Sequence, residues 1–364
     1  MNALALHEFH QALNARFAEV NGQEVVHDYG DPLAEHAALC GSAGILDLSF
    51  RSRLCLTGAD RQRFLHGQVT NNVTDLDPGE GCYAALVTAK GKMQSDLNLY
   101  CLPDEILLDF EPGFSDLIAA RLKKFIIADD VEVVDATLPY GLLSVQGPQA
   151  APVVTKLDLG APLPTRLMSF SSVNVPALGE VLCINQPRGQ APGFDLFIPR
   201  PAMAVVADTL ITAAKAVGGR ACGWQALEMV RIEAGIPRFG ADMDETNLPP
   251  EAGIECRAVS YSKGCYIGQE VIARIRTYGQ VAKALRGLRL ADDLKALPNK
   301  GDKLFRDGKE VGYLTSALAS PALKANLALG YVRREHNQVG TELKLQSAGG
   351  ESPARIVPLP FARD

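Results

Sequence analysis

The sequence predicts an α+β protein that ends in a small β-barrel. Helix-like and strand-like segments mix irregularly before about residue 276, which is typical of α+β folds and not of an alternating βαβ chain. From residue 281 onward, short strand-like segments alternate with turns rich in glycine, asparagine and aspartate. With 364 residues, the chain is long enough for two or three compact units. We therefore expect two interleaved α+β subdomains over residues 1–275 and the barrel over residues 276–364.

Several earlier segments carry the spacing of amphipathic helices. Apolar side chains recur with helical periodicity at the start of the chain, at Phe9, Leu13, Phe17 and Val20. Further helices are expected within residues 58–68, 114–126, 201–217 and 222–235. By contrast, residues 236–270 show little periodicity and many turn residues. Loops of this length in a compact protein are usually functional or disordered, so this segment is a candidate for the functional region.

Composition excludes several classes of protein. The 36 basic and 42 acidic residues give a net charge of −6, which disfavours a general nucleic-acid-binding surface. The eight cysteines are scattered without a CxxC pair, so we expect no metal site. So many unpaired thiols also indicate a protein that resides in a reducing compartment. Neither a signal peptide nor an uninterrupted run of 18 apolar residues is found. The sequence therefore predicts a soluble, cytoplasmic protein without a membrane partner.

The segment Lys263-Gly-Cys-Tyr-Ile-Gly-Gln-Glu270 is the strongest candidate for chemistry. If a helix begins near Glu270, Cys265 lies just before its positive end. That helix end and the Lys263 ammonium would both favour the thiolate, which is the nucleophilic form of cysteine. The alternative is that Cys265 is a small buried hydrophobic residue, as most unpaired cysteines are.

A second candidate group lies on the helix expected within residues 222–235. Trp224, Glu228 and Arg231 share one face of this helix at spacings of four and three residues. An aromatic ring beside a guanidinium and a carboxylate suits a flat heteroaromatic ligand with an anionic tail. The alternative is a core tryptophan beside a salt bridge three residues apart.

Two aspartates interrupt strand-like segments. Asp96 follows Lys90-Gly-Lys-Met-Gln-Ser, and Asp195 lies in Gly193-Phe-Asp-Leu-Phe. A carboxylate at either position could accept hydrogen bonds from a ring N–H or an amine. Both residues could instead be ordinary strand-end aspartates.

With these residues in view, the chain resembles the folate-binding YgfZ family. YgfZ is a branch of the glycine cleavage T-protein (aminomethyltransferase) superfamily. The segment Lys263–Glu270 is similar to the K-G-C-Y-x-G-Q-E signature of that branch. The superfamily-wide motifs are Gly44-Ile-Leu-Asp-Leu-Ser, Leu56-Thr-Gly-Ala-Asp, Gln146-Gly-Pro, Gly193-Phe-Asp, Arg231-Ile-Glu-Ala-Gly and Pro249-Pro-Glu-Ala-Gly.

The resemblance implies a three-part, clover-like molecule with tetrahydrofolate, or a one-carbon derivative of it, in a central channel. It implies that Asp96 assists chemistry at the folate nitrogen and that Asp195 holds the pterin. Lys263 and Cys265 would form the functional centre together with Asp96. The other candidate folate contacts are Trp224, Glu228, Arg231 and Tyr266.

The resemblance also implies a function, namely an accessory role in assembly or repair of iron–sulfur clusters. The partners would be iron–sulfur enzymes or cluster-assembly proteins, with an indirect role in tRNA modification. Ser95-Asp96 replaces the acidic pair usual in T-proteins, and Asp195 replaces the commoner glutamate. These differences argue against aminomethyl transfer, so a folate-dependent aminomethyltransferase is only the alternative function. Whether the protein is an enzyme stays open at this point. A tRNA-binding or protein-binding module is a third reading, disfavoured by the net charge.

Overall fold

The chain divides into two compact units in the computed structural model, which describes residues 2–279 and 281–362. Unit 1 comprises the described residues of Met1–Gln68, Asn72–Ala84 and Asp96–Val230. Unit 2 comprises those of Val69–Asn71, Ala85–Ser95 and Arg231–Asp364. Two short segments of unit 2 therefore lie within the sequence range of unit 1. The expected domain boundary at residue 276 stays a prediction.

The two larger open β-sheets of the described chain lie mainly in unit 1, and only the parts of β5 and β6 within Ala85–Ser95 belong to unit 2. One has six strands in the order β10-β11-β12-β9-β3-β13, and the other has the order β5-β6-β7-β4-β8. The strands of the first are β3 (Gly44–Asp47), β9 (Tyr140–Gln146), β10 (Phe170–Val175), β11 (Gly179–Asn185), β12 (Gly193–Pro199) and β13 (Arg220–Ala221). The strands of the second are β4 (Ser52–Thr57), β5 (Glu80–Val87), β6 (Met93–Cys101), β7 (Ile106–Phe110) and β8 (Glu132–Asp135).

The central strands of the six-stranded sheet are buried on both faces, and their side chains alternate between two cores. On one face, Leu142 and Phe197 share a hydrophobic cluster with Cys55, Tyr100 and Leu107 of the other sheet. Tyr100 and Phe197 meet there edge to face, with ring centroids 6.0 Å apart. The opposite face packs against helices through a second cluster, which includes Val145, Leu196, Ile198, Val206 and Leu210. The two sheets thus enclose a shared layer between them.

Most helices follow the predicted positions, but the first is shorter than expected, and those at Pro32–Gly41 and Ala150–Val154 were not predicted. The structure contains α1 (His7–Ala12), α2 (Pro32–Gly41), α3 (Arg61–Gln68), α4 (Ser115–Lys123), α5 (Ala150–Val154), α6 (Met203–Ala216) and α7 (Trp224–Glu233). The helix expected through Val20 ends early, because Asn14 adopts a left-handed conformation with φ of 60°. The following residues form β1 (Arg16–Val20), which pairs with β2 (Gln23–Asp28).

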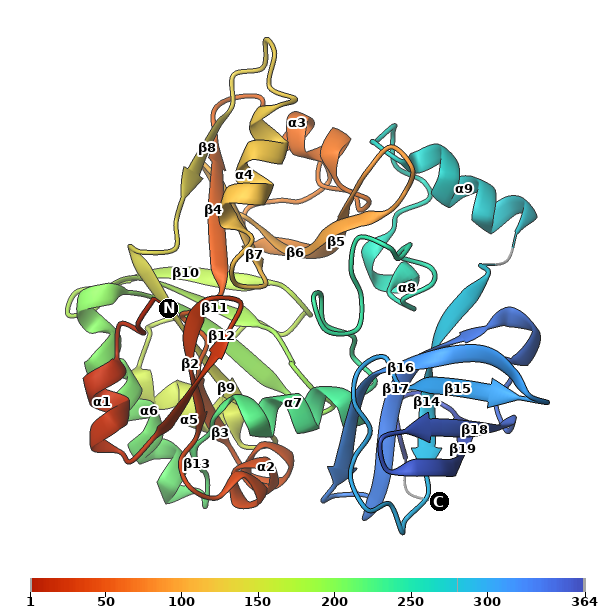
Figure 1. Cartoon of the computed structure of the whole chain (residues 1–364). Helices are drawn as coiled ribbons and strands as arrows, with labels where there is room; N and C mark the ends of the chain where they lie inside the picture. The colour runs from red at the N-terminus through yellow and green to blue at the C-terminus, as the bar shows by residue number, and fades with distance from the viewer. Residues whose placement is uncertain (1, 280, 363–364) are drawn as a thin grey trace. The chain divides into compact units, whose positions relative to one another are not determined.

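The predicted C-terminal barrel is confirmed. Six strands close in the order β14-β17-β16-β15-β18-β19, drawn in blue shades in Figure 1. They are β14 (Lys283–Leu290), β15 (Lys303–Arg306), β16 (Lys309–Ser320), β17 (Ala325–Arg333), β18 (Glu342–Ser347) and β19 (Gly350–Val357). Their buried residues form one cluster that includes Leu288, Leu304, Leu314, Val332 and Leu345. Closure leaves the barrel without an unpaired sheet edge.

The weakly periodic segment before the barrel is mostly irregular, as expected. It contains α8 (Glu255–Ala258), and α9 (Gln269–Tyr278) follows it. Gly268 precedes α9 with φ of +86°, a conformation that residues with a Cβ rarely adopt. A Cβ on Gly268 would lie 2.5 Å from the Thr88 carbonyl oxygen. The tight turn into α9 therefore requires glycine.

We expect Gly268→Ala to lower the free energy of unfolding by about 2–4 kcal/mol, because backbone strain and a steric clash add together. Gly253→Ala is the matched control, since Gly253 has φ of +74° and a Cβ there would have nothing within 4 Å. This control should cost about 1–2 kcal/mol. Urea denaturation of the two variants measures the difference. Equal losses would contradict the proposed close approach.

Candidate functional site

A group of charged side chains lies in the layer between the two sheets of unit 1. The charge network, as we call it, consists of Arg51, Asp109, Glu111, Arg188 and Asp195. Asp109 lies on β7, Asp195 lies on β12, and the other three flank strands. Both sheets therefore contribute acidic residues to one buried network.

Arg51 binds the two acidic residues that come from the β7 segment. Its Nε lies 2.9 Å and 3.1 Å from the carboxylate oxygens of Asp109, and its Nη1 lies 2.6 Å from Oε1 of Glu111. All three residues are buried. Burial opposes ionisation of Asp109, but the nearby guanidiniums outweigh burial and lower its pKa. Asp109 is therefore held as a carboxylate.

Arg188 makes the corresponding contact with the other sheet. Its Nε lies 3.1 Å from Oδ1 of Asp195, and its Nη2 lies 2.5 Å from Oδ2. The same Nη2 is 4.0 Å from Asp109. Burial opposes the charge of Arg188, but Asp195 and Asp109 outweigh it and raise the pKa of the guanidinium. Arg188 thus connects an aspartate of β12 to an aspartate of β7.

Asp96 lies on β6 and is electrostatically coupled to the charge network. It is only partly buried, and its Oδ2 accepts a hydrogen bond of 2.8 Å from the Tyr83 hydroxyl. Burial and the nearby Glu111 carboxylate raise the pKa of Asp96 to about 6. A carboxyl group with this pKa exchanges a proton near neutral pH, as a general acid or base requires.

Strand register explains how these residues come together. Asn98 of β6 lies directly opposite Asp109 of β7, and its Nδ2 donates to Oδ2 of Asp109 at 3.0 Å. Asp96 is two residues from Asn98, and Glu111 is two residues from Asp109, so the four share one face of the sheet. Asp96 was predicted from the sequence, whereas Asn98, Asp109 and Glu111 were not. Polar residues alternating with apolar ones in both segments were the signal that could have located them.

The chemistry of this region fits a pterin. The Tyr100 hydroxyl is buried beside the charge network and has no hydrogen-bond partner among the residues that the structure describes. A buried polar group of this kind normally has a partner. Carboxylates, guanidiniums and hydroxyls together match a heteroaromatic ring that carries both N–H donors and carbonyl or nitrogen acceptors.

The signature segment in unit 2 presents Cys265 to solvent. Cys265 and Gly264 are exposed, whereas Lys263 and Tyr266 on either side are buried. The alternative reading of Cys265 as a buried hydrophobic residue is therefore wrong. Cys265 precedes the first residue of α9, Gln269, by four positions, which places it outside the first helical turn.

Lys263 anchors this segment through its ammonium group. Nζ donates hydrogen bonds to the Val69 and Asn71 carbonyl oxygens at 2.7 Å and 2.9 Å. It also lies 4.8 Å from the centre of the Tyr266 ring, a cation–π contact. Burial raises the pKa of the Tyr266 hydroxyl to about 12. Lys263 and Tyr266 thus fix the backbone on both sides of Cys265, and their expected roles toward folate and the thiol stay predictions.

The three residues predicted to share a face of α7 have different surroundings. Trp224 packs edge to face on Phe50, with ring centroids 5.4 Å apart, and contacts the hydrophobic cluster between the sheets. Glu228 is partly buried in unit 1, whereas Arg231 belongs to unit 2. The Arg231 guanidinium is buried and lies 2.5 Å from Oδ2 of Asp242. Trp224 thus packs partly buried against the core, and the ion pair of Arg231 is with Asp242, eleven residues away, and not the expected one three residues apart. The folate-binding role of the three residues stays a prediction.

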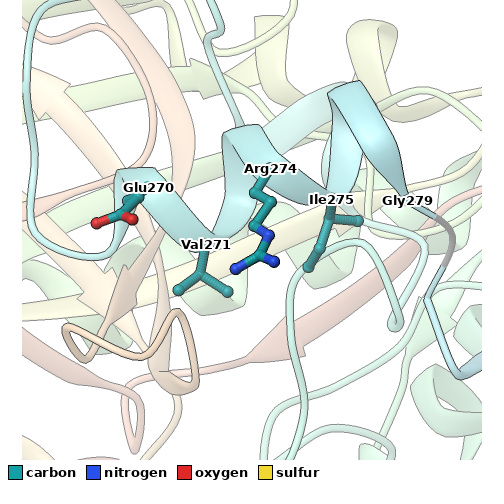
Figure 2. A pocket seen from close by; sticks show the side chains of 5 residues that line it. All are labelled: Glu270, Val271, Arg274, Ile275 and Gly279. Atoms are coloured by element: carbon teal, nitrogen blue, oxygen red, sulfur yellow. The ribbon is translucent and has the colours of Figure 1, made fainter.

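A hollow of about 340 Å³ runs along α9, the helix that follows Cys265. Figure 2 shows Glu270, Val271, Arg274 and Ile275 on the side of the helix that faces it. Glu270 and Arg274 are four residues apart, as are Val271 and Ile275. The hollow therefore has charged and apolar walls from one helix face.

Comparison with known families assigns the chain as a whole. Residues 6–263 match the GCVT N-terminal domain, and residues 283–362 match the glycine cleavage T-protein C-terminal barrel domain. The chain belongs to the glycine cleavage T-protein family. Members of the T-protein family bind tetrahydrofolate, which agrees with the pterin-like chemistry of the charge network.

Curated relatives of this T-protein-family chain match over nearly its full length. An aminomethyltransferase of Geobacillus thermodenitrificans is 30% identical over 95% of this chain and 94% of its own. An aminomethyltransferase of Rubrobacter xylanophilus is 30% identical over 98% and 93%. A third, from Symbiobacterium thermophilum, is 28% identical over 98% and 96%. The expected aminomethyltransferase-like superfamily is thus confirmed.

The same fold occurs in a solved structure. The glycine cleavage system aminomethyltransferase T of Bartonella henselae superimposes with a TM-score of 0.89, covering 99% of this chain and 98% of that chain, at 23% identity. The predicted T-protein fold is therefore confirmed, and the central channel stays a prediction. No helix among residues 2–279 and 281–362 combines the length and apolar character that spanning a bilayer requires.

We expect Asp96→Asn to change how stability depends on pH. The pKa of Asp96 is about 6 in the folded protein and 3.8 in an unperturbed aspartate. The folded state therefore binds more protons between these values, so the contribution of Asp96 to stability falls as pH rises through this window. Relative to wild type, the variant should gain about 1–2 kcal/mol between about pH 4 and about pH 7, allowing for partial exposure.

Urea denaturation at several pH values measures this gain. Asp104→Asn, a change at an exposed carboxylate of the same unit, is the control and should track wild type. A stability difference between Asp96→Asn and wild type that stays constant with pH would show that Asp96 is not perturbed.

Proposed function

We propose that this chain binds tetrahydrofolate, or a one-carbon derivative of it, and supports the assembly or repair of iron–sulfur clusters in the manner of the YgfZ branch. The supporting observation is the exposed Cys265 within the signature segment Lys263–Glu270. A thiol that serves another protein must be reachable, and its supporting backbone must be ordered. Burial of Lys263 and Tyr266 on either side provides that order.

The charge network and Asp96 are the groups proposed to hold the pterin in unit 1. Asp96 is partly exposed and hydrogen-bonded to Tyr83, so it can accept a ring N–H or exchange a proton. Reduced folate supplies a one-carbon unit carried on nitrogen. The contribution of these side chains would be to orient the ring and to hold the proton near it.

Complementation of a deletion strain tests the proposed role of Cys265. We expect Cys265→Ala to leave iron–sulfur enzyme activity at the level of the deletion strain while the protein remains folded. Cys40→Ala and Cys256→Ala are matched controls, because these cysteines are also exposed. Both controls should restore activity fully. Full restoration by Cys265→Ala would exclude the proposed role.

A second candidate function is aminomethyl transfer from a lipoyl carrier. It is favoured by the curated relatives, which are named aminomethyltransferases, and by Asp96, whose pKa of about 6 suits proton transfer. The substitution of the usual acidic pair by Ser95-Asp96 argues against it. The partners in this case would be the carrier protein and folate.

Turnover with an aminomethyl-lipoyl carrier and tetrahydrofolate tests this candidate. An aminomethyltransferase would release ammonia and methylene-tetrahydrofolate. Asp96→Asn would then slow the reaction by about 10²–10⁴-fold, whereas Cys265→Ala would not change it. Absence of ammonia release with a carrier that a known aminomethyltransferase accepts would remove the candidate.

A further inference from the structure

Arg188 and Asp195 differ in how accessible they are. The side chain of Asp195 is 1% exposed and that of Arg188 is 12% exposed. Both carboxylate oxygens of Asp195 already accept hydrogen bonds from Arg188. Of the two side chains, that of Arg188 is therefore the more accessible to a ligand.

Arg188 retains hydrogen-bond donors after binding Asp195. A guanidinium carries five N–H groups, and the bidentate contact uses one on Nε and one on Nη2. Its separation from Asp109, 4.0 Å, is too long for a direct hydrogen bond. Within the part of the chain that the structure describes, Nη1 donates to no acceptor. The free donors can serve a ligand.

The backbone around Arg188 is held in place. Its N–H donates to Oε1 of Gln146 at 2.9 Å, and Gln146 is buried. A Cβ on Gly193 would lie 2.1 Å from that same oxygen, so this close packing depends on glycine. Arg188 is thus fixed at two points, its backbone N–H and its guanidinium. A preorganised donor binds a ligand with a smaller entropy cost.

We propose that Arg188, and not Asp195, makes the direct contact with the pterin, and that Asp195 is a positioning residue acting through Arg188. This inference rests on the proposed binding of reduced folate. The ligand atom facing Arg188 is then a hydrogen-bond acceptor, such as the ring carbonyl oxygen. This reverses the polarity that an acidic contact residue would impose, because a carboxylate accepts hydrogen bonds from ring N–H groups.

The opposite arrangement requires Arg188 to turn away so that Asp195 can accept from the pterin. That movement would break two charge-assisted hydrogen bonds to a buried carboxylate, which are among the stronger contacts in proteins. It would also separate two buried charges, which is costly unless the ligand replaces both partners. The proposed contact leaves the ion pair intact.

Calorimetric binding of tetrahydrofolate to the full chain distinguishes the two arrangements. We expect Arg188→Gln and the double variant Arg188→Gln/Asp195→Asn each to weaken binding by about tenfold or more, and to agree within about threefold. Since Arg188→Gln leaves a buried carboxylate unpaired and could impair folding, Arg188→Lys keeps the charge but loses the fork and should weaken binding similarly. Arg200→Lys, at an exposed position of the same unit, is the control.

A 4-amino analogue of tetrahydrofolate probes the polarity directly, since its ring carbonyl oxygen is replaced by a donor. Wild type should bind the analogue at least about tenfold more weakly, and Arg188→Gln should lose most of this preference, because the glutamine amide can accept as well as donate a hydrogen bond. The proposal would be overturned if Arg188→Lys bound folate as tightly as wild type or more tightly, and only a change of Asp195 weakened binding. That result would leave the proposed folate-binding function standing. Absence of folate binding by wild type would overturn the proposed function as well.

Discussion

The candidate site of unit 1 depends on the ion pairs that Arg51 and Arg188 form with acidic side chains of two sheets. A buried charge is tolerated only when an opposite charge and hydrogen bonds compensate it. Asp109 stands between both guanidiniums, at 2.9 Å from Arg51 and 4.0 Å from Arg188. The register of β6 and β7 and the position of β12 must therefore stay fixed together, because a shift of either would leave a charge unpaired.

Asp96 is electrostatically coupled to this network through Glu111 and Arg51. It shares a sheet face with Glu111, whose carboxylate together with burial raises the pKa of Asp96. A charged acid that is fully paired keeps a low pKa, as Asp109 shows. The same small region therefore lowers the pKa of one carboxyl group and raises the pKa of another to about 6, a divergence of pKa values that functional sites commonly use.

The signature segment of unit 2 separates anchoring from exposure within four residues. From the sequence alone, Lys263 is expected to favour the thiolate form of Cys265. In the folded chain the Lys263 ammonium binds two backbone carbonyls and an aromatic ring, and Cys265 faces solvent. These contacts hold the backbone on both sides of an exposed cysteine. Gly268 completes the segment, because only glycine fits against the Thr88 carbonyl oxygen.

Local patterns in the sequence predicted most helices from residue 58 onward, though not Ala150–Val154, and the C-terminal barrel, because periodicity and turn chemistry are properties of neighbouring residues. They also singled out residues 263–270 as a candidate site. The same patterns predicted a first helix that is too long, because the pairing of β1 with β2 depends on residues outside the helical pattern. Only the tertiary structure decided that Arg188 holds Asp195, that Asn98 faces Asp109, and that Arg231 pairs with Asp242. These contacts join residues brought together by strand register and packing, and charge pairing across such distances leaves no periodic trace in the sequence.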